Sequence, residues 1–206
     1  MPHAAESPLG ALRKFAGAAR QTAAGETERC ELCNVSISAR HRHLLETFSR
    51  KIVCACDPCA LRFQNVVEGR FKLVPRDARA LPGFQINDAE WEALALPIDL
   101  AFFFYSMPSG KMIAMYPSPA GPTESLLPLT AWETLAAANP DLREMQADVE
   151  ALLANRVGDT REYFIAPIDK CYELVGTIRK HWKGLSGGEE VWREIGNFFT
   201  ALQSST

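Results

Sequence analysis

Apolar residues near the C-terminus recur at steps of three and four, which is the spacing of one face of an α-helix. The first such face consists of Ile168, Cys171, Tyr172, Val175, Ile178 and Trp182. A second face spans 189–202, after a glycine-containing break at 184–188. The pattern therefore predicts two amphipathic helices, at 168–182 and 189–202.

The middle of the chain has shorter apolar runs that indicate β-strands. Residues 100–105 and 112–116 flank a turn sequence and predict a β-hairpin. The remaining expected elements are strands at 71–75 and 162–166 and short helices at 88–94 and 130–138. The run 149–157 fits a helix or a strand, and the proline-rich segment 117–122 is expected to be neither a helix nor a central strand.

The N-terminal third follows a different pattern. Residues 43–47 and 51–56 predict two short strands joined by a turn. A helix is expected from Cys59 to Val67, with Asp57 as its N-cap and Pro58 as its first residue. We therefore divide the chain into a flexible segment at 1–28, a metal-binding module at 29–68 and a mixed α+β domain at 69–206.

Composition narrows the classes of protein. The apolar fraction of 47% is typical of a globular chain. Residues 1–70 hold ten Lys and Arg against seven Asp and Glu, a charge of +3, which is slight for a nucleic-acid-binding face, so nucleic acid is not an expected partner. No apolar run reaches the roughly 20 residues of a membrane span, and no signal-peptide core is evident, so we expect a cytoplasmic protein.

Two Cys-x-x-Cys pairs, Cys30/Cys33 and Cys56/Cys59, are the strongest chemical signal in the sequence. The two pairs are separated by 22 residues, a length that suits a β-hairpin bringing them together. Four thiolates from two such turns make a tetrahedral metal site. Zn²⁺ in a structural role is favoured over a single iron, because residue 60 is Ala where rubredoxin turns carry Gly. Cys59 is expected in the first turn of a helix, where free N–H groups favour a thiolate.

Three further residues near these pairs have open roles. Cys54 would point to the same face as Cys56 if both were on one strand, and it is a core residue, an alternative ligand or a redox-active thiol. His41 and His43 are expected on the exposed side of the hairpin or in hydrogen bonds to the metal sulfurs. A histidine pair beside a zinc-braced turn also fits an HNH-type nuclease, for which Asn65 is the only plausible metal-site residue in the following helix.

The acidic residues of the C-terminal domain do not form a recognisable acid/base pair. Asp148, Glu150, Asp169 and Glu173 carry carboxylates, but nothing in their spacing places two of them beside a nucleophile. Capping and solvated roles are therefore favoured, and Cys171 is expected to be packed on its helix face. The sequence predicts no catalytic residue.

Several short motifs in this order resemble a bacterial zinc-ribbon-like family encoded beside oxygen-tolerant, high-affinity nickel–iron hydrogenases. The motifs are Cys30–Cys33, His41–Leu45, Cys54–Leu61, Tyr116–Gly121, Asp148–Leu153, Pro167–Tyr172 and Trp182–Gly184. The resemblance covers about 28–203 and brings no catalytic residue with it. It implies a cytoplasmic accessory protein whose partner is a hydrogenase subunit or maturation factor, and it suggests that His43 and Cys54 belong to the metal module.

Three functions therefore remain open at this stage. The favoured one is a non-catalytic zinc-binding adaptor or assembly factor of a nickel–iron hydrogenase system. The first alternative is a rubredoxin-like electron carrier with one iron on the same four cysteines. The second alternative is the HNH-like metal-dependent nuclease.

Overall fold

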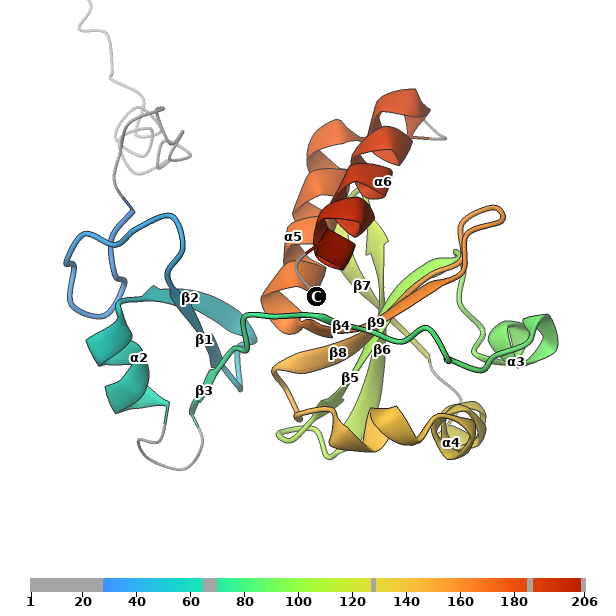
Figure 1. The fold of residues 1–206 in the computed structure, drawn as a ribbon, viewed down its shortest axis with the longest axis horizontal. Coiled ribbons are helices and arrows are strands. Elements are labelled where there is room, and N and C mark those ends of the chain that lie inside the picture. The colour runs from blue at the N-terminus through green and yellow to red at the C-terminus, as the bar shows by residue number, and fades with distance from the viewer. Residues whose placement is uncertain (1–27, 65–69, 127–128, 185–186, 205–206) are drawn as a thin grey trace, which may run out of the picture.

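The computed structural model describes residues 28–64, 70–126, 129–184 and 187–204. The expected flexible segment therefore lies outside the described residues, apart from its last position, and so does Asn65. The described chain is mixed α+β, as the sequence predicts, with two separate antiparallel sheets (Figure 1).

The first sheet has three strands in the order β2-β1-β3, formed by β1 (Arg42–Glu46), β2 (Lys51–Ala55) and β3 (Phe71–Leu73). The short helix α2 (Asp57–Phe63) lies between β2 and β3 in the chain. Strand β3 pairs with β1, so this sheet continues beyond residue 68. We call this sheet, helix α2 and the turn that holds Cys30 and Cys33 the small module.

The second sheet has six strands in the order β4-β9-β8-β5-β6-β7. Its strands are β4 (Arg79–Ala80), β5 (Leu100–Ser106), β6 (Lys111–Ser118), β7 (Gly121–Ser125), β8 (Glu150–Asn155) and β9 (Glu162–Pro167). Its helices are α3 (Asp88–Ala93), α4 (Leu129–Ala138), the 3₁₀ turn η1 (Pro140–Glu144), α5 (Ile168–His181) and α6 (Gly188–Ser204). We call this second sheet and its helices the large module.

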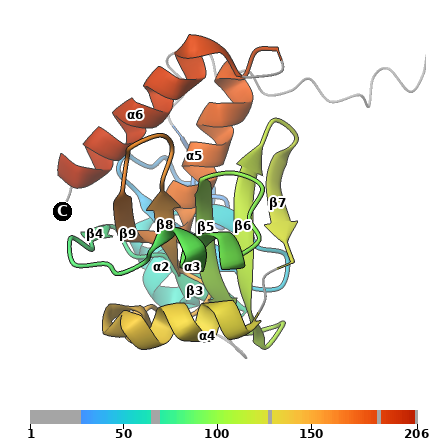
Figure 2. The ribbon, with the colours of Figure 1, turned by 90° about the vertical axis from the view of Figure 1, so that its right-hand side faces the viewer.

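Both faces of the large sheet are buried. Phe102 and Phe104 lie in one apolar cluster with residues of α5 and α6, whereas Phe103 between them lies in a second cluster with residues of α3 and α4. Successive strand residues point to opposite faces, so a run of three buried phenylalanines requires a cover on each face. The two helix pairs provide these covers (Figure 2).

Most sequence predictions for the large module are confirmed. The expected helices and the hairpin of β5 and β6 are present, and α3 begins with a capping box between Asn87 and Glu90. The ambiguous run 149–157 contains strand β8, and all of its strand residues are buried.

Segment 117–122 is neither a helix nor a central strand, as the sequence predicts, but it is not an irregular loop either, because β6 and β7 form an edge hairpin through it. Pro117 lies opposite Pro122, beyond the last residue of β6 that pairs with β5. Strand β7 is at the edge of the sheet. A proline without an N–H is tolerated at such positions, because no central ladder depends on it.

The small sheet has two faces with different neighbours. Leu44 of β1 and Val53 of β2 pack in a cluster with Cys30 and with α2. Leu45 instead belongs to the main cluster of the large module, and Ile52 packs against that cluster. The sheet thus lies between the cysteine turns and α2 on one side and the large module on the other (Figure 1).

Candidate metal centre

The four cysteines of the two Cys-x-x-Cys pairs converge in the small module. The Sγ atoms of Cys30, Cys33, Cys56 and Cys59 all lie within 4.8 Å of one another. The Sγ atoms of Cys33 and Cys56 are 3.7 Å apart, and no disulfide forms among the described cysteines. A tetrahedron with metal–sulfur bonds of about 2.3 Å has edges of about 3.8 Å, so this group can hold a metal ion.

The first cysteine turn is built by local hydrogen bonds. Asn34 has a left-handed backbone with φ of 63°, and its N–H donates to the Cys30 carbonyl at 2.8 Å. Asparagine tolerates this conformation better than most residues, which explains its place directly after Cys33. The turn closes with a bond from the Cys30 N–H to the Val35 carbonyl.

Backbone N–H groups surround the sulfur of Cys30. Burial raises the pKa of this thiol, but N–H donors of Cys56, Cys33 and Leu32 outweigh burial and lower the pKa to about 6. The turn therefore stabilises a thiolate at Cys30, which is the form that binds metals.

The second cysteine turn is the start of helix α2. The helix begins at Asp57, and Cys56 is its N-cap, so the expected N-cap at Asp57 is wrong by one residue. This shift matters because Cys56 no longer belongs to strand β2, which ends at Ala55. Cys56 turns away from Cys54 and joins the cysteine cluster, although the sequence predicted both on one face.

Cys59 does not show the expected preference for a thiolate. Burial raises the pKa of Cys59, and hydrogen bonding with Cys56, Cys33 and Cys30 raises it further. Four thiolates at this separation repel one another, so without a cation some of them hold protons. A bound divalent cation removes this repulsion.

A second group of metal-ligating side chains lies on the opposite face of the small sheet. His43 and Cys54 are cross-strand partners on β1 and β2, and His41 lies beside them. One ligand atom of each of these residues lies within 4.8 Å of the others. Cys54 belongs to none of the apolar clusters of the described residues and is partly exposed, so the interpretation as a core residue is wrong.

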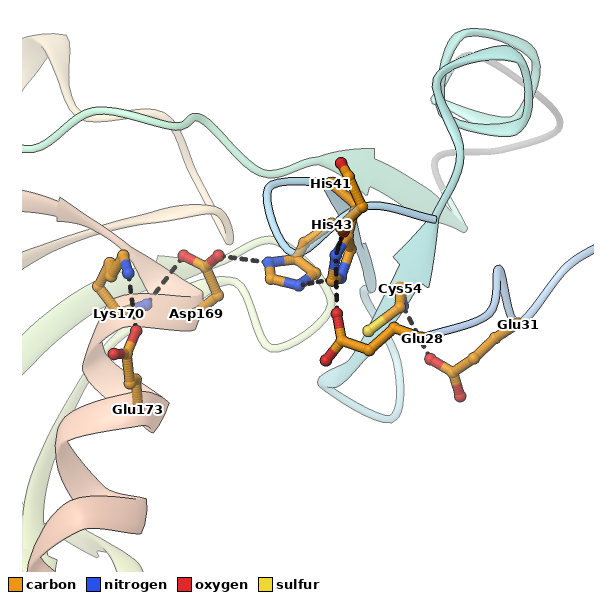
Figure 3. Close-up of polar contacts among 9 residues, drawn as sticks. Glu28, Glu31, His41, His43, Cys54, Asp169, Lys170 and Glu173 are labelled. Atoms are coloured by element: carbon orange, nitrogen blue, oxygen red, sulfur yellow. Dashed lines mark hydrogen bonds and ion pairs between the residues drawn. The ribbon is translucent and has the colours of Figure 1, made fainter. Parts of the chain in front are cut away.

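Both histidines in this group contact oxygen atoms through Nδ1. His43 Nδ1 is 2.6 Å from Asp169 Oδ2, and His41 Nδ1 is 2.9 Å from the Ser38 carbonyl and 3.1 Å from Glu28 Oε2 (Figure 3). The Nε2 atoms of the two rings face each other at 3.0 Å. The histidines therefore do not bond to the cysteine sulfurs on the other face of the sheet. The expectation of such hydrogen bonds is wrong.

Asp169 was missed as a site residue, because 126 positions separate it from His43. It lies in the first turn of α5 and was interpreted only as an ordinary residue of a helix start. No local pattern indicates that this turn packs on β1. The other acidic candidates have structural partners: Asp148 bonds to Lys72, Glu150 to the Gln146 N–H and Glu173 to Lys170.

The family comparison covers most of the chain. The model of the family of unknown function DUF5947 matches residues 29–206. The chain belongs to this family. Neither the curated proteins nor the solved structures include a match to it. Among the described residues, no helix is both long and apolar enough to cross a membrane.

Proposed function

We propose that this DUF5947 protein is a non-catalytic zinc-binding accessory protein in which Cys30, Cys33, Cys56 and Cys59 bind one structural Zn²⁺. The observation that carries the proposal is the convergence of four free sulfurs from two turns, with backbone N–H donors on Cys30. A turn and a helix start supply these ligands, and the β1–β2 hairpin lies between them in the chain, which is the arrangement of zinc-ribbon and treble-clef modules. Four protein ligands leave no open position, as in structural zinc sites.

The small size of the neighbouring core supports a structural role. The apolar cluster beside the cysteines has five buried residues, and one of them is Cys30 itself. A cluster of this size buries little apolar surface, so a metal ion would supply much of the folding free energy of the small module.

The second cysteine turn supports zinc over a single iron. The N–H of Ala60 donates to the Cys56 carbonyl as part of helix α2, so it does not donate to a sulfur as the corresponding residue of a rubredoxin turn does. Fewer N–H donors to the sulfurs give less stabilisation of a reducible iron centre.

The proposed partner is a component of a nickel–iron hydrogenase system, either a subunit or a maturation factor. The support for this partner is the order of motifs over about 28–203, which resembles the family encoded beside such hydrogenases. In this proposal the zinc-braced module holds a partner protein and performs no turnover. Deletion of the gene should lower hydrogenase content, cofactor loading or activity, and three unchanged values would contradict the adaptor role.

Metal content tests the zinc site directly. Protein purified without a metal-affinity tag should be colourless and hold zinc, and Cys33→Ser should lose the zinc of the four-cysteine site. Visible thiolate-to-iron absorption that reductant bleaches would instead make the protein an electron carrier.

A further inference from the structure

The group of His41, His43 and Cys54 has the geometry of a second metal site. The Nε2 atoms of the two rings are 3.0 Å apart, and one ligand atom each of His41, just before β1, His43 on β1 and Cys54 on β2 lies within 4.8 Å of the others. Tetrahedral coordination with bonds of about 2.0–2.1 Å separates two histidine nitrogens by about 3.3 Å. The observed separation of 3.0 Å needs only a small opening to match that value.

The hydrogen bonds of the two rings fix which nitrogens are free. Nδ1 of His43 faces a carboxylate oxygen of Asp169, and Nδ1 of His41 faces the Ser38 carbonyl and Glu28. Oxygen acceptors at Nδ1 favour the tautomer with a proton on Nδ1, which leaves a lone pair on Nε2. Two such lone pairs facing each other repel unless a proton or a metal ion lies between them.

The third member of the group favours a metal ion. A shared proton needs only the two rings, whereas Cys54 adds a soft sulfur ligand at the same point. Histidines that bind metals almost always donate their other N–H to a carboxylate or carbonyl, and both rings here have that partner. The side chain of His41 is only 8% exposed, so the ring is held in place by its surroundings.

We propose that His41 Nε2, His43 Nε2 and Cys54 Sγ bind a second Zn²⁺ ion, separate from the ion on the four cysteines. Two imidazoles and one thiolate suit Zn²⁺, and three protein ligands leave the fourth position to water or another small ligand. Both histidines line a cavity of about 510 Å³ between the small and large modules, with Arg40, Arg76 and Lys170 on its wall. The histidine side of the proposed site therefore borders this cavity.

The two sites are independent in their ligands. They lie on opposite faces of the small sheet and have no residue in common, because Cys54 points away from Cys56. The second site also connects the modules, since Asp169 of α5 orients His43 of β1 (Figure 3). An ion at this position would therefore hold the small sheet against α5.

Zinc stoichiometry of the full chain tests the proposal. Wild-type protein saturated with Zn²⁺ and then freed of excess ion should hold two equivalents, and His43→Gln should hold one. The matched control is His181→Gln, since His181 also has a carboxylate partner, Glu190, but lies at the end of α5. This control should keep both equivalents.

A second variant separates ligand loss from misfolding. Asp169→Asn keeps all three ligands and removes only the carboxylate, so the affinity of the second equivalent should fall roughly 10- to 100-fold while the first is unchanged. Co²⁺ replacement should give tetrahedral absorption bands whose thiolate component decreases in Cys54→Ser. Binding of a single equivalent by wild-type protein, or retention of both by His43→Gln, would overturn the proposal.

Discussion

The small and large modules differ in what stabilises them. The large module has two apolar clusters of 22 and ten buried residues on the two faces of its sheet, whereas the small module has one cluster of five. The large module can therefore fold through burial of apolar surface alone. The small module has four converging cysteine sulfurs beside its small cluster, and in the proposed function a metal ion on these sulfurs stabilises it.

Removal of the structural ion is the most severe test of this difference. Under the proposed function, Cys33→Ser should unfold the small module, with a loss of more than about 5 kcal/mol, because the zinc ion would supply most of its folding free energy. Amide hydrogen exchange measured by mass spectrometry should show β1 and β2 losing protection while β5, β8 and β9 keep it.

The control is Val35→Ala, since Val35 is 50% exposed beside the first cysteine turn and belongs to neither group of metal-ligating side chains. It should leave β1 and β2 protected. Equal loss of protection in both modules of Cys33→Ser would show that they do not fold separately.

A substitution in the core of the large module should destabilise that module and leave the small module unchanged. Phe103 is fully buried on β5 and stacks on Trp132 with ring centroids 5.5 Å apart. Phe103→Ala should cost about 3–5 kcal/mol of unfolding free energy, because it removes apolar contacts and leaves a cavity. Zinc content of the four-cysteine site should stay unchanged.

The comparison variant is Phe48→Ala, since Phe48 is 75% exposed in the small module. Its effect on denaturant unfolding should be within about 0.5 kcal/mol. A loss of zinc in Phe103→Ala would contradict the independence of the two modules.

The sequence predicted local features better than contacts between modules. The cysteine spacing predicted which four sulfurs converge, since all four cysteines lie within 30 residues and each pair shares one turn. The helix faces of α5 and α6 followed from their periodicity. Whether Cys54 and Cys56 share a face of the sheet could not be predicted, because it depends on where β2 ends. A strand that ends one residue earlier places Cys56 on the other side of the sheet from Cys54.

Asp169 and Asp148 show the limit of such prediction. Each has a partner in the small module, His43 and Lys72 respectively, that is 75 or more positions away. Helix-start and loop acidic residues are common, so their local sequence contains no sign of these partners. Only the packing of β1 and β3 against the large module brings them together.

The contact between Lys72 and Asp148 tests how firmly the modules are joined. Asp148 is buried with a left-handed φ of 70°, and it accepts bonds from Lys72 Nζ at 2.6 Å and from the Met107 N–H at 2.9 Å. Asp148→Ala should cost about 2–3 kcal/mol, since the Met107 N–H loses its acceptor and the Lys72 ammonium keeps only the Ala147 carbonyl.

Lys72→Met separates the ion pair from the backbone contact of Asp148. It removes the ammonium but keeps the hydrogen bond from the Met107 N–H to Asp148. Its cost should be about 1 kcal/mol, as Lys72 is partly exposed to solvent. Both values are measured by urea unfolding. An equal cost for the two variants would show that the ion pair, and not the loop geometry around Asp148, accounts for the effect.

The smallest expected effect concerns pH at the connection between α5 and α6, far from either metal group. Hydrogen bonds from Lys183 and His181 lower the pKa of Glu190 to about 2. A carboxylate with a lowered folded-state pKa stabilises the fold above its unfolded pKa of about 4.3, and this contribution is lost as the pH falls toward 2.

The thermal unfolding temperature should therefore fall more steeply between pH 5 and pH 2 in the wild-type chain than in Glu190→Gln. Glu133→Gln, which changes an exposed glutamate of α4, should follow the wild-type profile. Acid also protonates cysteine thiolates and would release the proposed zinc ion, so the comparison is made on chelator-treated protein, in which the large module is expected to account for the transition. If Glu190→Gln and the wild-type chain gave parallel profiles under these conditions, the ion pairs at this connection would be too well solvated to stabilise the large module.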